Sequence, residues 1–133
     1  MSPETLVLID LLAGRKKLVA MLAPSFPIVF DFPEIIGQLK RLGFAYVVEV
    51  AAGAQKTNED LLRVLVQNPD QGFITSPCAT FQQAVRTKYP QLVKFLAPVD
   101  SPMVQTAKLV RQKWPGFKPV FIGPCPATSA SPI

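Results

Sequence analysis

A short apolar segment over residues 17–23 constrains the fold most. It is apolar after its first residue, and Pro24 bounds it at the end. A run this short with no alternation between apolar and polar residues is typical of a strand buried on both faces. Such strands occur in parallel sheets that helices cover on both sides, so the segment predicts an α/β fold.

Further short apolar segments alternate with amphipathic ones along the chain. Strands are expected over residues 46–51, 72–75 and 119–122, and helices over residues 2–12, 33–42, 57–68, 78–89, 90–96 (a turn) and 101–114. Strands that alternate with helices pair in parallel through right-handed crossovers. We therefore predict a three-layer α/β/α sandwich with a four-stranded parallel sheet in the flavodoxin-like order 2-1-3-4.

Composition narrows the class of protein. The chain has 133 residues, of which 49% are hydrophobic and 17% charged, as expected for one folded domain and not for a disordered chain. We divide it into an N-terminal helix and linker (1–16), an α/β lobe (17–126) and a loose tail (127–133). No segment has the length of a membrane span or the pattern of a signal peptide, so a cytoplasmic protein without membrane partners is expected.

Charge and histidine content exclude several functions. The net charge is +5, but the basic residues are scattered along the sequence and no stripe interleaved with aromatic residues is visible, so no nucleic-acid partner is expected. The chain has no histidine, which excludes Ser-His-Asp triads and His-ligated zinc.

The two cysteines, Cys78 and Cys125, each follow a proline at the end of an apolar segment. In a parallel sheet the carboxyl ends of the strands meet at one edge, where ligands bind. The thiols could share a metal cluster there or form a disulfide, which is less expected in the cytosol. A start of a helix at Cys78 would favour the thiolate. Each cysteine could instead be a small buried apolar residue.

Three motifs around this edge resemble a known family. They are Ala23-Pro24-Ser25, Thr75-Ser76-Pro77-Cys78 and Gly123-Pro124-Cys125. With Phe81, Tyr89-Pro90 and Ser101-Pro102 between them, their order over residues 17–128 resembles the N-terminal lobe of the H-cluster domain of iron-only (FeFe) hydrogenases.

The resemblance implies that Cys78 and Cys125 are two of the four cysteines that hold a 4Fe-4S cubane. It places Ala23, Pro24, Ser25, Ser76, Pro77 and Pro124 beside the cluster, although turn and cap chemistry could equally account for Ser25 and Ser76.

The chain departs from the family's pattern at three positions. Pro77 replaces the proton-relay cysteine, Thr128 replaces the lysine that binds the di-iron unit, and Gly123 replaces a methionine. No residue is therefore assigned a catalytic role. The isolated chain is expected to be inactive, as in the sensory or non-catalytic branch of the family.

The resemblance also implies partners. In the family the two remaining cluster ligands belong to a second lobe. Here they would come from a missing C-terminal lobe, from a second copy of the chain, or not at all. The cluster is therefore expected to be incomplete or absent in the isolated chain. Ferredoxin-like or signalling modules are expected neighbours. The expected function is electron transfer or redox or hydrogen sensing; the alternative is a metal-free interaction or dimerisation scaffold. A flavodoxin-like ligand site is disfavoured, because no Gly-rich phosphate loop is present.

Overall fold

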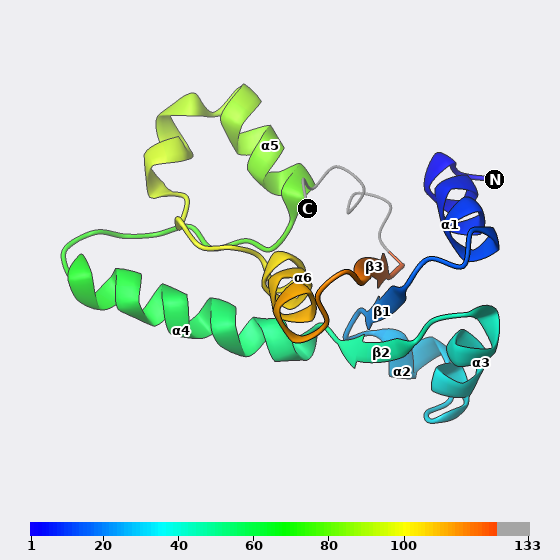
Figure 1. Cartoon of the computed structure of the whole chain (residues 1–133). Helices are drawn as coiled ribbons and strands as arrows, with labels where there is room; N and C mark the ends of the chain where they lie inside the picture. Colours follow the sequence, from blue (N-terminus) through cyan, green and yellow to red (C-terminus); the bar gives the residue numbers. More distant parts are fainter. Residues whose placement is uncertain (125–133) are drawn as a thin grey trace.

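The computed structural model describes residues 1–124. Helices and strands alternate along most of the chain (Figure 1). In chain order they are α1 (Pro3–Ala13), β1 (Leu18–Leu22), α2 (Phe26–Val29), α3 (Glu34–Leu42), β2 (Tyr46–Glu49), α4 (Ala51–Gln67), α5 (Ala79–Lys88), the 3₁₀ helix η1 (Pro90–Phe95), α6 (Pro102–Lys113) and β3 (Lys118–Ile122).

The sheet of the described residues has three parallel strands in the order β2-β1-β3. The central strand β1 is buried along its whole length, with Leu18 and Met21 at 0% exposure. This confirms the prediction of a strand buried on both faces, since the side chains that point to each face of the sheet are all buried.

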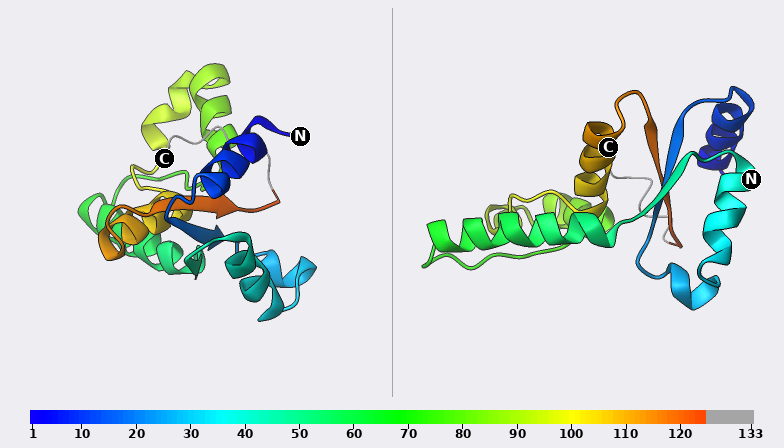
Figure 2. Two further views of the ribbon diagram at one scale, coloured as in Figure 1. Left: turned by 45° about the vertical axis from the view of Figure 1, so that its right-hand side comes forward. Right: turned by 60° about the horizontal axis from the view of Figure 1, so that its bottom comes forward.

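Helices cover both faces of the sheet (Figure 2). On one face Leu18, Ala20 and Leu22 pack with residues of α2 and α3, and apolar residues of α1 join this cluster. On the other face Val19 and Met21 pack against α6. The predicted three-layer α/β/α arrangement is confirmed.

The expected strand over residues 72–75 lies outside this sheet. Ile74 makes one parallel bridge to Leu96, with its N–H donating to the Phe95 carbonyl at 2.6 Å. The position beside β1 is taken by β3, which pairs with all of Leu18–Leu22. The predicted order, with this segment between the first and last strands, is therefore wrong for the described residues.

Helix α4 begins earlier than predicted. It starts at Ala51, directly after β2, whereas Thr57 was expected to begin it. Glu59 and Asp60 are therefore interior helix residues. They pair with Lys56 one turn earlier, and Asp60 also pairs with Arg63. Residues 57–60 were mistaken for the start of a helix, because acidic residues that form ion pairs one turn apart inside a helix are the same residue types that favour a helix start.

Gly53 lies near the start of α4, where this helix crosses α6. A Cβ atom here would overlap the Pro102 carbonyl oxygen and the Thr106 Oγ1, and would lie 2.7 Å from the Thr106 nitrogen. The Thr106 hydroxyl donates to the Pro102 carbonyl at 2.8 Å. The absence of a side chain at Gly53 therefore sets how closely the two helices approach.

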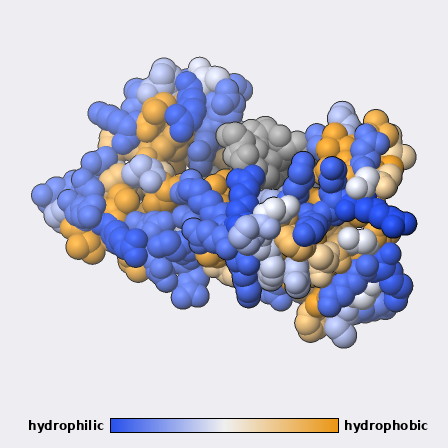
Figure 3. Space-filling view, viewed as in Figure 1, coloured by the Kyte–Doolittle hydropathy of each residue, from blue (hydrophilic) through white to orange (hydrophobic). Residues whose placement is uncertain are grey.

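Exposed apolar side chains occur in groups on three of the described elements. Figure 3 shows some of them as patches separated by hydrophilic residues, over α1 among other places. They are Leu6, Val7 and Ile9 of α1, Ile28, Val29, Phe30 and Phe32 in and after α2, and Leu62, Leu65 and Val66 of α4. Among residues 1–124, no helix combines the length and apolar character needed to cross a bilayer.

Candidate functional site

The first motif lies beside Gly123 and Pro124 of the third motif at the carboxyl edge of the sheet. The N–H of Ala23, which follows β1, donates to the carbonyl of Ile122, the last residue of β3, at 2.9 Å. Ala23 is buried, Pro24 is exposed and Ser25 is half-buried. Pro124 is exposed at the end of the neighbouring strand. We call Ala23, Pro24, Ser25 and Pro124 the strand-end group.

Gly123 is part of the same edge and has little space around it. A Cβ atom at this position would lie 2.5 Å from Phe121 Cε1 and 3.1 Å from the Ala23 Cβ. A larger residue would therefore fit only if the Phe121 ring moved. The methionine that the resemblance places here would need a different arrangement of that ring.

The Ser76-Pro77-Cys78 turn holds an exposed thiol. Cys78 is the N-cap of α5, and the Phe81 N–H donates to its sulfur at 3.4 Å. The Cys78 N–H donates to the Ser76 hydroxyl at 3.1 Å, and the Gln82 side chain donates to the Ser76 carbonyl at 2.9 Å. The turn is thus fixed by its own hydrogen bonds and presents the sulfur at a helix N-terminus, as predicted.

The turn belongs to a part of the chain that packs away from the sheet. In Figure 1, α5 and η1 lie against each other on one side of α6, and the sheet lies on the other side. Cys125 falls outside the described residues, as do residue 126 of the predicted lobe, Thr128 and the tail over residues 127–133. The convergence of the two thiols therefore stays a prediction.

The described residues do not by themselves fit a complete cubane. A 4Fe-4S cluster is held by four cysteine thiolates. Among residues 1–124 Cys78 is the one cysteine, and no group of three or more Cys, His, Asp or Glu side chains is close enough to hold a metal. Cys78 can supply one ligand, and the other ligands must come from elsewhere.

A cavity of about 180 Å³ lies beside the turn. Ser76 and Pro77 line it together with Thr57 and Leu61 of α4 and residues 96–97 and 99–102. The Thr57 hydroxyl donates to the Asp100 carbonyl at 3.0 Å across this region. Sequence patterns could not reveal the cavity, because it depends on the pairing of Ile74 with Leu96.

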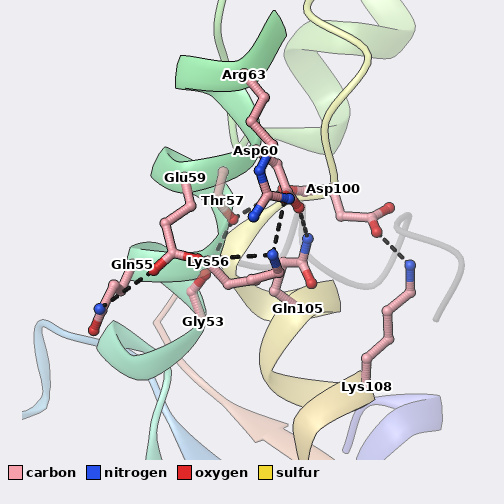
Figure 4. A network of polar contacts seen from close by, with 10 residues as sticks. All are labelled: Gly53, Gln55, Lys56, Thr57, Glu59, Asp60, Arg63, Asp100, Gln105 and Lys108. Atoms are coloured by element: carbon pink, nitrogen blue, oxygen red, sulfur yellow. Dashed lines mark hydrogen bonds and ion pairs between the residues drawn. The ribbon is translucent and has the colours of Figure 1, made fainter.

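A polar network holds α4 against α6 (Figure 4). Asp60 accepts hydrogen bonds from the Lys56 ammonium at 3.0 Å, from the Arg63 guanidinium at 3.1 Å and from the Gln105 amide of α6 at 2.8 Å. The hydrogen bond from Lys56, together with the positive charges of Lys56 and Arg63, lowers the pKa of Asp60, and partial burial opposes this. The Asp60 carboxylate is engaged in these contacts within α4 and with α6, so it is not a free base for catalysis.

A family model for the C-terminal domain of the iron-only hydrogenase large subunit matches residues 16–130, which include every motif quoted above. The chain belongs to this family. The predicted membership is thereby confirmed, and the chain is a hydrogenase-like domain in this sense. No curated protein sequence matches it.

Solved hydrogenases share this domain's fold. FeFe-hydrogenase HydA1 from Chlamydomonas reinhardtii, in a variant form, superposes with a TM-score of 0.81 at 21% identity, over 96% of this chain and 39% of the other. A HydA(deltaEFG) structure that concerns stepwise assembly of the H-cluster gives 0.77 at 21% identity over the same shares of the two chains. Apo HydA1 in another variant form gives 0.72 at 22% identity, over 92% and 39%. The chain thus spans 39% of the length of these solved hydrogenases.

Proposed function

We propose that this hydrogenase-like domain binds part of an iron–sulfur cluster of the 4Fe-4S type through Cys78 and Cys125 and uses it for electron transfer or redox sensing. The observation that carries the proposal is the exposed Cys78 thiol at the N-cap of α5. A thiol that serves only as apolar filling would be buried, whereas a cluster ligand shared with another lobe must be accessible.

The arrangement of the strand ends supports the same site. Residues that the family resemblance places beside the cluster follow β1 and β3, which are hydrogen-bonded neighbours. Cys125 comes directly after Pro124 in the sequence. A cluster bound at the carboxyl edge would therefore lie next to the strand-end group and to the residue that follows Pro124, Cys125.

Hydrogen turnover by the chain itself is not part of the proposal. The residue before Cys78 is Pro77, which has no ionisable group and so cannot pass a proton. Its neighbour Ser76 is occupied in hydrogen bonds of the turn through both its hydroxyl and its carbonyl. The remaining ligands would come from a second lobe or a second copy of the chain, and a cytoplasmic location stays a prediction.

Anaerobic reconstitution with iron and sulfide tests the proposal. The chain should become brown, with charge-transfer absorbance in the visible range, and the Cys78→Ala and Cys125→Ala variants should each lose most of that absorbance. Thr87→Ala is the matched control and should keep it, since Thr87 is exposed near the other end of α5 and its hydroxyl bonds only within that helix. A colourless chain that behaves like its Cys78→Ala variant would show that the proposal is wrong.

One observation favours the second candidate, a metal-free interaction scaffold. Ile28 is 86% exposed, Val29 72% and Phe32 61%, and they lie in and after α2, which follows β1 at the carboxyl edge. Exposed apolar patches mark sites of association. Light scattering should then show self-association that Ile28→Ser with Phe32→Ser reduces, without iron. A clean monomer at all concentrations would exclude homodimerisation through this patch.

A further inference from the structure

The fold gathers basic residues at the amino edge of the sheet, opposite the strand-end group. Segments 10–17, 40–46 and 111–118 meet there, because they lead from the C-terminal ends of α1, α3 and α6 to the starts of β1, β2 and β3. Together they carry eight Lys or Arg side chains and one carboxylate, Asp10. The rest of the chain carries six cations against eight carboxylates, so the positive excess of the molecule lies at this edge.

We call these eight side chains the basic edge. They are Arg15, Lys16, Lys17, Lys40, Arg41, Arg111, Lys113 and Lys118. All eight residues are exposed. The ion pairs found among residues 1–124 involve Lys56, Arg63 and Lys108, and none of them involves the basic edge.

Direct contacts join the segments into one surface. The Lys118 N–H donates to the Lys17 carbonyl at 2.8 Å, which joins the starts of β1 and β3. A Cβ atom on Gly43 would lie 3.3 Å from Leu12 Cδ2, so the ends of α1 and α3 are adjacent. The right-hand view of Figure 2 shows the α1–β1, α3–β2 and α6–β3 connections at the same end of the strands.

An aromatic cluster lies within the same surface. The Tyr46 ring stacks on Trp114 at 4.5 Å and lies 5.6 Å from Phe117. Lys113 Nζ lies 4.9 Å from the centre of the Trp114 ring, and Lys17 Nζ lies 5.6 Å from that of Phe117. These contacts hold two of the ammonium groups in place, which reduces the entropy lost when they bind an anion.

Stabilisation of helix ends explains only part of the basic edge. Cations in a last helical turn complement the helix dipole, and Lys40, Arg41, Arg111 and Lys113 have such positions. The other four lie in connections or at strand starts, outside any helix. Like charges gathered with a single carboxylate repel one another, so these four cations add little to the stability of the fold beyond the contact of Lys17 with Phe117.

We propose that the basic edge is a docking surface for an acidic protein surface, separate from the cluster site and independent of it. Charge complementarity speeds association and fixes orientation. A nucleic acid fits less well for two reasons. The stacked Tyr46 and Trp114 rings do not offer both faces to bases, and this edge presents helix carbonyl ends, whereas phosphates are favoured by the N–H groups of helix N-termini.

Fluorescence anisotropy with a labelled oligo-glutamate peptide tests the proposal on the whole chain. The native chain should bind the peptide with an affinity that falls as salt rises. The variant Lys16→Gln with Lys113→Gln and Lys118→Gln should bind about tenfold more weakly, since it removes three close charge partners. Circular dichroism should show that its fold is retained.

The matched control carries the same change in net charge elsewhere. Arg86→Gln with Lys88→Gln and Lys94→Gln removes three exposed cations of α5 and η1 and should bind within about twofold of the native chain. An equal loss in both variants would mean that net charge alone drives binding, and the assigned surface would be wrong. Tighter binding of duplex DNA or of anionic vesicles than of the peptide, abolished by the edge variant, would overturn the choice of an acidic protein.

Discussion

Gly53 and Gly37 are both helical glycines, but their surroundings differ. A Cβ atom on Gly53 would overlap backbone and side-chain atoms of α6, whereas on Gly37 it would meet only Arg41 Nη1 at 3.9 Å. The effect of a substitution on stability therefore depends on the packing around each glycine and not on the residue type alone.

We expect Gly53→Ala to destabilise the chain by about 1–3 kcal/mol, because α4 and α6 must move apart to admit the methyl group. Gly37→Ala is the control and should be neutral or stabilising by up to ~1 kcal/mol through helix propensity. Urea unfolding followed by circular dichroism measures both. Equal effects of the two substitutions would contradict the helix crossing described here.

Asp60 gives a prediction on pH. Its pKa is lowered in the folded chain, chiefly by the hydrogen bond from Lys56. A carboxylate with a depressed folded pKa stabilises the fold above its unfolded pKa of about 3.9, and this contribution is lost as the pH falls through the folded value. The native chain should therefore be more stable than Asp60→Asn at neutral pH, and the difference should shrink in acid.

Urea midpoints of the two chains between neutral pH and about pH 2 measure this difference. Glu59→Gln is a suitable control, because Glu59 is exposed and its contacts are longer, an ion pair with Lys56 at 3.7 Å and a hydrogen bond from Gln55 at 3.4 Å. A gap between native chain and Asp60→Asn that stays constant into strong acid would show that the charge of Asp60 is not what matters.

At the scale of elements, the helix starts follow simple local rules. Ser101 is the N-cap of α6 and accepts a hydrogen bond from the Val104 N–H at 3.3 Å, with Pro102 in the first turn. Ser2 has the same arrangement at α1, where its hydroxyl accepts from the Thr5 N–H at 3.3 Å. Helix starts at both serines were expected from the sequence, and both are confirmed.

The consequence of losing each cap should nevertheless differ. Helix α6 has buried residues such as Ala107 and Val110, whereas α1 has none. We expect Ser101→Ala to lower the free energy of unfolding by about 1 kcal/mol and Ser2→Ala to have a smaller effect, because α1 can fray without opening the core. Thermal melting of both variants checks this, and a larger loss for Ser2→Ala would contradict the assigned core.

Local pattern predicted the central strand and most helices, but not every pairing. The segment over residues 17–23 could be recognised because burial on both faces leaves an uninterrupted apolar run. The segment over residues 72–75 looks similar, yet its backbone hydrogen bonds go to Phe95 and Ala97. Either this segment or β3 could pair with β1, and in the structure β3 does. The residues of one short apolar segment do not indicate which of the two pairs more favourably.

At the scale of the whole molecule, the sheet has one apolar cluster under α1, α2 and α3 and another under α6, and α5 packs with η1 apart from both. The candidate site has residues from both parts. The strand-end group could be predicted because β1 and β3 end together. The separation of Cys78 from the sheet could not, because it follows from the pairing of Ile74.

Hydrogen exchange should show the difference between the two parts. The amides of β1 lie in a fully buried strand and should exchange only on global unfolding. Those of α5, where Val85 is the one buried residue, should exchange by local opening at least about tenfold faster. Mass spectrometry of peptides from the two segments measures this. Equal protection would mean that α5 unfolds together with the sheet.

Iron bound per chain after anaerobic reconstitution tests the central claim most directly. A cubane shared between two copies, with Cys78 and Cys125 from each, predicts about two iron atoms per chain. The Cys78→Ala variant should then keep only a small fraction of that iron. Native chain and Cys78→Ala variant with the same iron content would contradict the assignment of Cys78 as a cluster ligand.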